Sequence, residues 1–321
     1  MELNKRKSLI LRPKAPYDFD STVFKPAHYP SSLDLYKTRK YWFAMRFNNK
    51  IYGVKMESIG TVNKPKIKVT IFSKSNISKK ELDRIIDEIK FRFEFDIDLS
   101  EFYKKFKKDK VLSPFLKKWF GMHNSCAQNL YGLLMIGIFL QNTIVKRTVQ
   151  MTEVMLKKYG IKVKFDKKEV YEFWKPEKMR KASEEELRKL KIGYRAKLFI
   201  KLSESFIKEK INEFELRKMS VEEAKKKLIQ LYGVGPETAR ILLQEALHHY
   251  STFEHVAPWQ QKIYSRLFFN KRSVPIQKII KYVQRKWGKW AVLAVNYIWE
   301  DIFWQRKQGK KIGWLDKEIR L

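Results

Sequence analysis

Alternating apolar and polar residues in the first 95 positions predict an antiparallel β-sheet. Tyr41–Phe47 and Ile51–Met56 suit two strands joined by a tight turn, and Lys66–Phe72 alternates as a third strand. Ser78–Glu81 has the form of a capping box and predicts a helix whose apolar stripe covers the sheet, formed by Leu82, Ile85, Ile86 and Ile89. We therefore expect a small α+β domain over residues 1–95.

From about residue 96 the pattern becomes helical. Leu130–Leu140 is apolar on almost every face, which predicts a central buried helix that is too short to span a membrane. Another capping box, Ser220–Glu223, predicts the start of a helix with an inward face of Val221, Ala224, Leu228 and Leu231. Gly233–Gly235 ends that helix, and Pro236 suits the first position of the next one. We expect residues 96–321 to form an all-helical domain that contains this hairpin.

The hairpin has a chemical property beyond its shape. Glycines leave backbone amides uncovered, and uncovered amides at a helix N-terminus bind anions such as phosphate. A lone Gly-x-Gly is a weak signal, because an ordinary turn between two helices has the same sequence.

The charge balance favours the phosphate interpretation. The chain has 69 Lys and Arg against 35 Asp and Glu, a formal net charge of +34 over 321 residues. Such an excess indicates a polyanionic partner, of which nucleic acid is the first candidate and an anionic membrane surface the second. Neither a long apolar run nor a signal-type apolar core follows the N-terminus, so we expect no membrane partner. Adaptation to heat would explain abundant charge but not its sign.

Cysteine and histidine usage narrows the chemistry. Cys126 is the only cysteine, which excludes an intrachain disulfide, a four-cysteine iron–sulfur cluster and a thiolate zinc site, and fits an intracellular protein. The five histidines have no metal-ligand spacing, so we expect no metal bound by side chains. The C-terminal stretch Lys271–Leu321 is basic. Its Trp304–Trp314 part either binds a phosphate backbone or is a solvated helix end whose tryptophans pack inward.

Four segments resemble those of the helix-hairpin-helix DNA glycosylase superfamily, in its 3-methyladenine glycosylase II and 8-oxoguanine glycosylase branch. Leu231–Ala239 resembles the family hairpin Leu-Pro-Gly-Val-Gly-x-x-Thr-Ala, and Val256–Leu267 resembles the sequel that begins Val-Asp. Leu190–Lys197 resembles the Leu-Gly-Tyr-Arg-Ala-Lys turn, and Ile138–Lys146 resembles the segment before the loop that wedges into the duplex. The order and spacing of these segments match the family.

The resemblance implies a two-domain α+β protein, with a small N-terminal antiparallel sheet domain and a mostly α-helical glycosylase domain. It implies an enzyme of base excision repair that flips a damaged base out of double-stranded DNA and hydrolyses its N-glycosidic bond. An alkylated or deaminated purine is the favoured base, with 8-oxoguanine or a mismatched thymine or uracil as alternatives. We expect a monomer that needs no cofactor, with a Na⁺ or K⁺ ion on the carbonyls of Gly233 and Gly235 as in the family.

The resemblance also assigns roles to individual residues. We expect DNA contacts from Gly233, Val234, Gly235 and Thr238 of the hairpin, from Gln141, Asn142 and Thr143 at the intercalating or base-opposite loop, and from Lys262. Near the site that the resemblance implies, the sequence offers Tyr232, Phe253, Trp259 and Tyr264, and we expect Tyr232, Trp259 and Tyr264 to form an aromatic pocket for the flipped base. The alternative is that these aromatic residues are part of the core, as most tryptophans and tyrosines are.

The chain departs from the family at both catalytic positions. Ala257 stands where the family has the aspartate that stabilises positive charge on the sugar. Glu237 stands where strand-cutting branches have a lysine that forms a Schiff base, so we expect no lyase activity unless another lysine substitutes.

Three interpretations of Ala257 follow. The alanine is an inactivating replacement of aspartate, the carboxylate has moved to Glu237 or Glu254, or the chain is a noncatalytic DNA-binding protein. The simpler interpretation of Glu237 is that its negative charge lies in the first turn of a helix and interacts favourably with the helix dipole.

Overall fold

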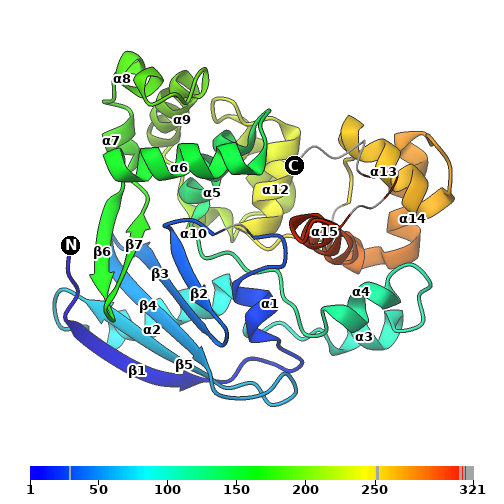
Figure 1. Ribbon diagram of the computed structural model, residues 1–321, viewed down its shortest axis with the longest axis horizontal. Coiled ribbons are helices and arrows are strands. Elements are labelled where there is room, and N and C mark those ends of the chain that lie inside the picture. Colours follow the sequence, from blue (N-terminus) through cyan, green and yellow to red (C-terminus); the bar gives the residue numbers. More distant parts are fainter. Residues whose placement is uncertain (29, 251–252, 311–312, 314, 316–321) are drawn as a thin grey trace.

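The computed structural model describes residues 1–28, 30–250, 253–310, 313 and 315, and its first part is a five-stranded antiparallel sheet (Figure 1). The strands follow one another across the sheet in the order β1-β5-β4-β3-β2. Their bounds are β1 Lys5–Leu11, β2 Asp34–Lys37, β3 Lys40–Phe47, β4 Lys50–Ser58 and β5 Ile67–Ser73, with helix α1 at Phe19–Val23 and α2 at Lys79–Arg92. We call residues 1–95 the N-terminal domain.

The three strands predicted from alternation are confirmed as β3, β4 and β5. Asn48 and Asn49 both have positive φ angles in the tight turn between β3 and β4, as a two-residue hairpin turn requires. The predicted cap of α2 is also present, because the side chain of Ser78 accepts a hydrogen bond from the amide of Glu81. The edge strands β1 and β2 were not predicted: β1 is mostly exposed and has no clear alternation, and β2 is only four residues long.

Both faces of this sheet are covered. Helix α2 packs on one face with Ile85, Ile86 and Ile89. The other face packs against a hairpin of β6 (Ile161–Phe165) and β7 (Lys168–Glu172), through Val163 and Phe165. The expectation that residues 96–321 are all helical is therefore wrong for this segment, where apolar residues alternate with lysines. The region is otherwise mostly helical.

The remaining helices form two apolar clusters, which define a central lobe and a C-terminal lobe. The central lobe contains α5 (Leu130–Leu140), α6 (Val145–Tyr159), α7 (Pro176–Met179), α8 (Glu184–Lys189), α9 (Arg195–Lys208), α10 (Glu213–Leu216), α11 (Val221–Ile229) and α12 (Pro236–Glu245). The C-terminal lobe contains α3 (Ser100–Phe106), α4 (Ser113–Lys118), α13 (Pro258–Phe269), α14 (Ile276–Trp287), the short η1 (Gly288–Trp290) and α15 (Ala291–Lys307).

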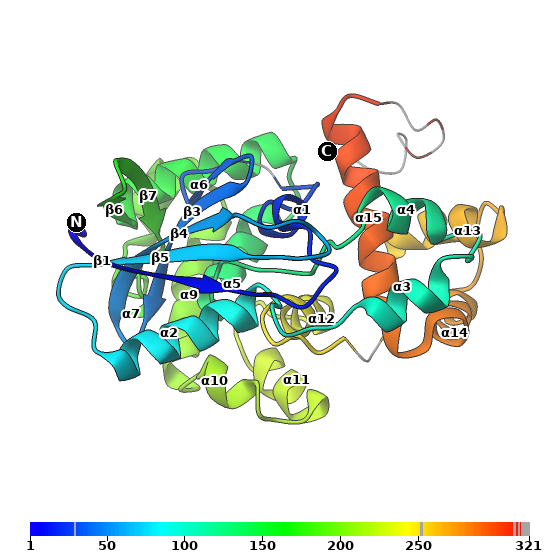
Figure 2. The same cartoon turned by 90° about the horizontal axis from the view of Figure 1, so that it is seen from below.

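The two lobes lie side by side, with α12 and α15 facing each other (Figures 1 and 2). Helix α5 begins and ends as predicted and is largely buried in the central lobe. Within the described residues, no helix is both long and apolar enough to cross a membrane.

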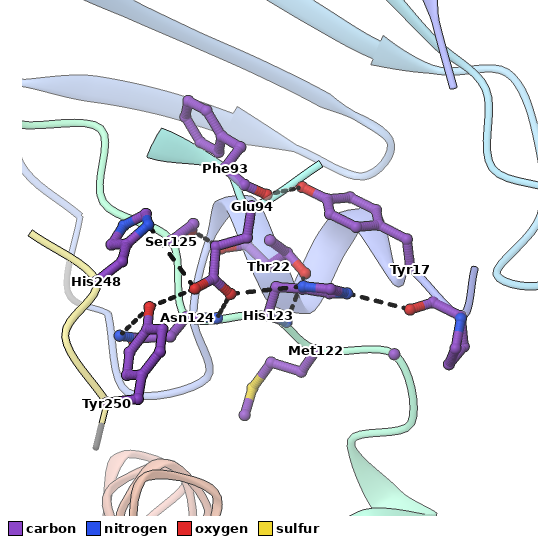
Figure 3. A network of polar contacts seen from close by, with 12 residues as sticks. Tyr17, Thr22, Phe93, Glu94, Met122, His123, Asn124, Ser125, His248 and Tyr250 are labelled. Carbon is purple, nitrogen blue, oxygen red and sulfur yellow. Dashed lines mark hydrogen bonds and ion pairs between the residues drawn. The ribbon is translucent and has the colours of Figure 1, made fainter. Parts of the chain in front are cut away.

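Two buried carboxylates connect the N-terminal domain to the lobes. Glu88 of α2 accepts hydrogen bonds from Arg92 at 2.6 Å and from Arg217, which follows α10, at 2.6 and 2.9 Å. Glu94, just after α2, accepts from the amide of Asn124 at 2.9 Å and from the hydroxyl of Tyr250 (Figure 3). The chain before α5 and the chain after α12 are thereby fixed to the end of α2.

We expect the Glu88 cluster to make stability depend on pH. Burial alone would raise the pKa of Glu88, but Arg92 and Arg217 outweigh it and lower that pKa from 4.5 to about 2. The stabilisation is therefore fully present above about pH 4.5 and is lost as pH falls toward 2. Glu88→Gln should lower the unfolding free energy at neutral pH by about 3 kcal/mol, and less below pH 4. Denaturant unfolding of both proteins from pH 3 to 7 measures this.

The control for that series is Asp87→Asn on the exposed face of the same helix. This variant should differ from the original chain by less than about 0.5 kcal/mol at every pH. A constant difference between the Glu88→Gln variant and the original chain across the pH range would contradict the prediction.

The close approach of β6 to the sheet gives a second prediction. A side-chain carbon added at Gly53 of β4 would lie 2.5 Å from the ring of Phe165. Gly53→Ala should therefore lower the unfolding free energy by about 1–3 kcal/mol. The matched control is Gly137→Ala in α5, where an added carbon meets nothing within 4 Å and should stabilise the helix by about 0.5–1 kcal/mol. Equal unfolding midpoints for the two variants would refute the proposed packing.

Candidate active site

A cavity of about 890 Å³ lies where the N-terminal domain meets both lobes. The segment between Val23 and Tyr41 forms one wall, and α5, α6 and α12 contribute the wall of the central lobe. The C-terminal lobe contributes Trp259 and Gln260 from α13 and Trp299 and Phe303 from α15. Most of the surface that the cavity exposes is apolar, although nearly half of the lining residues are polar or charged and come from separate elements.

One wall of the cavity is a row of aromatic rings. The ring centres of Trp259 and Trp299 are 5.4 Å apart, and Trp299 stacks on Phe303 at 5.4 Å with an interplanar angle of 25°. Trp259 is 49% exposed, Trp299 is only 9% exposed and Phe303 is half-buried, so Trp299 is the most buried ring of the row. Aromatic faces of this kind can hold a planar ring by stacking.

Ala257 lies at the N-cap of α13, two residues before Trp259 and three before Gln260, which line the cavity, although Ala257 itself is not among the lining residues. It is buried, and its amide donates a hydrogen bond to the side chain of Gln260 at 3.0 Å. An N-cap position favours Asp, Asn, Ser or Thr, because their side-chain oxygens accept hydrogen bonds from the first-turn amides. A carboxylate at position 257 would therefore suit the backbone geometry.

Glu237 lines the same cavity from the first turn of α12. Both of its carboxylate oxygens accept hydrogen bonds from Arg240, at 2.8 and 3.0 Å. Nε2 of His255 lies 3.4 Å from Oε2 of Glu237. Burial alone would lower the pKa of Arg240, but the hydrogen bonds and charge of Glu237 outweigh it and raise that pKa. Glu254, the other carboxylate considered, is half exposed beside Lys225 and is not among the residues that line the cavity.

A second ion pair lies in the cavity wall. Lys25 donates hydrogen bonds to Glu245 and to Asn124, each at 2.7 Å. Burial alone would lower the pKa of Lys25, but the negative charges of Glu245 and Glu300 outweigh it and raise that pKa well above its ordinary value. Burial raises the pKa of the neighbouring Cys126 thiol to about 11, so this free thiol is protonated at neutral pH.

The helical hairpin has the predicted geometry. Ser220 and Glu223 form the capping box of α11, and Gly233 has a φ of +77°, which favours glycine. Gly235 is the N-cap of α12 and supplies no side-chain cap, and an added carbon there would meet nothing within 4 Å. Val234 is buried between the two helices, and Thr238 is half-buried in the first turn of α12.

The loop between α5 and α6 connects the hairpin with the cavity. Gln141 borders a small hollow that Gly233 and Thr238 also line, and Thr143 lines the large cavity. The buried Arg195 holds the loop, since its guanidinium donates to the carbonyls of Ile138, at 3.1 Å, and Gln141. Asn142 is exposed with a positive φ of 47°, and Leu140 beside it is exposed and borders the cavity.

Two of the three expected pocket aromatics lie elsewhere. Tyr232 is exposed on the hairpin, and Tyr264 is buried in the C-terminal lobe, where its hydroxyl accepts a hydrogen bond from Trp299 at 2.7 Å. Neither belongs to the cavity wall, which corrects the expectation, and only Trp259 of the three lines it. Lys262 is exposed on α13.

Sequence reasoning missed several residues that the fold brings to the cavity, among them Lys25, Asp34, Arg240, Glu245, Trp299 and Phe303. They come from separate parts of the chain and share no local motif. In the basic tail, Trp304 is half-buried and packs against Trp119 with ring centres 5.5 Å apart, whereas Trp314 falls outside the described residues.

Comparison with known proteins supports a single class. No protein-family model matches the chain. The DNA-3-methyladenine glycosylase of Bacillus subtilis (strain 168) is 21% identical over 250 residues, which are 76% of this chain and 81% of that protein.

Two solved structures share the fold over nearly the whole chain. The 3-methyladenine DNA glycosylase of Archaeoglobus fulgidus has a TM-score of 0.75 at 17% identity, covering 92% of this chain and 99% of that one. The 8-oxoguanine glycosylase/lyase of Clostridium acetobutylicum, in complex with double-stranded DNA, has a TM-score of 0.69 at 19% identity, covering 96% and 100%.

The fold of this chain is thus that of the DNA glycosylases. The N-terminal antiparallel sheet and the mostly helical remainder that holds the hairpin agree with the predicted fold class. These similarities confirm the predicted resemblance to the helix-hairpin-helix DNA glycosylase superfamily.

Proposed function

We propose that this protein is a DNA glycosylase of base excision repair, which receives a damaged base in the cavity and hydrolyses its N-glycosidic bond. One observation carries the proposal: the aromatic-walled cavity is lined by Trp259 and Gln260, which follow by two and three residues Ala257, the position where the family places its catalytic aspartate. A flipped base needs such stacking surfaces, and the sugar at the mouth needs a nearby carboxylate as positive charge develops.

The hairpin is the proposed DNA grip. Gly233, Gly235 and Thr238 would offer backbone amides to a phosphate, with a monovalent cation on the carbonyls of Gly233 and Gly235. The amide of Val234 donates to the carbonyl of Leu231 at 3.1 Å, so Val234 would support the turn rather than bind the phosphate. Gln141, Asn142 and Thr143 would enter the duplex next to the site, because their loop lies between the hairpin and the cavity. The net charge of +34 supports a DNA partner.

Of the possible carboxylates, we propose an aspartate at position 257 as the catalytic group of an active form. Glu237 is the better placed alternative in the present chain, because it lines the cavity, but Arg240 neutralises it. Glu254 is less suitable because it is half exposed and lies outside the cavity wall. A noncatalytic DNA-binding protein is the second candidate function, and the alanine at position 257 favours it.

We propose that the enzyme has no lyase activity. A lysine that forms a Schiff base must lose its proton, which a lowered pKa promotes. Among the described residues, Lys25 is the lysine that lines the cavity, and its raised pKa keeps it protonated beside Glu245. The damaged base is proposed to be an alkylated or deaminated purine, with 8-oxoguanine and mismatched thymine or uracil as alternatives.

The catalytic proposal predicts that Ala257→Asp creates or restores base release. Duplexes with hypoxanthine, 1-methyladenine, 3-methyladenine, 8-oxoguanine, uracil or mismatched thymine are incubated with each protein, and free base is measured. We expect the aspartate variant to release at least one of these bases about 100-fold faster than the original chain.

The matched control is Ala257→Asn, which caps α13 equally well but has no negative charge. It should release no more base than the original chain. If the aspartate variant releases no base from any duplex although both proteins bind DNA equally, the catalytic proposal fails. If the original chain is already active and Glu237→Gln removes this activity, the carboxylate has moved to Glu237.

The hairpin proposal predicts that Gly235→Asp weakens DNA binding without loss of stability. The aspartate can cap α12 and should not destabilise the protein, but its charge should repel a phosphate and weaken duplex binding about tenfold. Gly235→Ser provides a cap without charge and should bind more tightly than the aspartate variant. Fluorescence anisotropy at about 50 and 200 mM salt measures affinity, which should fall steeply with salt. Unchanged affinity of the aspartate variant would place the phosphate elsewhere.

A further inference from the structure

Asp34 lines the cavity and has one carboxylate oxygen without a hydrogen-bond partner among the described residues. It is the first residue of β2 and is only 5% exposed. Its Oδ2 accepts a hydrogen bond from the hydroxyl of Tyr41 at 2.7 Å. Its Oδ1 is buried and has no hydrogen-bond partner among the described residues. A buried carboxylate oxygen without a partner is costly, so a hydrogen-bond donor that reaches this atom from the cavity would relieve that cost.

The surroundings of Asp34 hold it in place. Nε2 of His28 lies 3.4 Å from Oδ2 of Asp34. The His28 ring packs on Phe24, with the two ring centres 4.5 Å apart. The backbone amide of Ala27, the residue before His28, donates a hydrogen bond to the buried Glu300 of α15 at 2.9 Å. The wall that holds Asp34 is therefore fixed to the helix that supplies Trp299 and Phe303 of the aromatic row.

The chemistry of a carboxylate determines which base it recognises. An ionised carboxylate accepts hydrogen bonds and donates none. The 6-oxopurines, such as hypoxanthine and guanine, have an N–H donor at ring position 1, whereas adenine and 3-methyladenine have a lone pair there. A lone pair facing Oδ1 would leave both acceptors unpaired in a buried site.

We propose that Asp34 is a specificity-determining residue that accepts a hydrogen bond from the N1–H group of an extruded 6-oxopurine. This inference rests on the proposed function and selects, among the purines considered above, those with the 6-oxo group. The aromatic row stacks on the faces of the base, and Asp34 recognises the edge of the base that carries N1. A base of the adenine type is disfavoured by the same atom.

The test compares binding of two duplexes that differ only at the purine edge. One has hypoxanthine and the other has unsubstituted purine, which has a lone pair at N1. Each base is placed opposite a non-hydrogen-bonding thymine isostere, so that pairing strength in the duplex is the same. Affinities are measured for the original chain, for Asp34→Asn and for Ser31→Ala, a neighbouring polar change in the same wall. Melting temperatures verify that each variant is folded.

We expect the original chain and the Ser31→Ala variant to bind the hypoxanthine duplex at least about tenfold more tightly than the purine duplex. An asparagine can still accept from Tyr41 and can also donate to N1, so Asp34→Asn should bring the ratio to within about threefold. A preference for hypoxanthine that persists in the folded Asp34→Asn variant overturns the inference and leaves the glycosylase proposal standing. Binding of both duplexes no more tightly than an undamaged duplex, by every protein, overturns the inference together with the proposed function.

Discussion

The cavity depends on buried carboxylates that hold the N-terminal domain against the two helical lobes. Glu88 joins α2 to Arg217, and Glu94 joins the end of α2 to Asn124 and Tyr250 (Figure 3). Both carboxylates are removed from water, so loss of either set of partners would leave a buried charge unpaired, at a cost of several kcal/mol. These contacts position the Val23–Tyr41 wall opposite α12 and α15.

The same constraint separates two tasks within the molecule. The hairpin lies at the surface and offers amides and glycines, whereas the cavity exposes mostly apolar surface with a few paired charges. The loop that Arg195 holds touches both regions, so a duplex on the hairpin would present one nucleotide to the cavity. Inside, Lys25 and Glu237 are each bound to an opposite charge, while Oδ1 of Asp34 is left to an incoming group.

Local patterns in the sequence predicted the elements whose signals are local. The strands β3 to β5, the buried helix α5 and the hairpin follow from alternation, continuous apolar composition and capping boxes. The strands β6 and β7 were missed because a short alternating segment in a helical region gives a weak signal. The cavity could not be predicted in detail, since Asp34, Arg240 and Trp299 are distant in sequence and meet only in the folded chain. Tyr264 was misplaced because position in a motif does not distinguish a core tyrosine from a pocket tyrosine.

The central claim is that the cavity between the three parts receives an extruded base. A crystal structure of the chain bound to a duplex with one hypoxanthine tests it most directly. The account predicts a base rotated out of the helix, stacked on the aromatic row of Trp259, Trp299 and Phe303, with Gly233 and Gly235 at a backbone phosphate. A duplex bound with all its bases stacked, or held on another face with the cavity empty, would contradict the account.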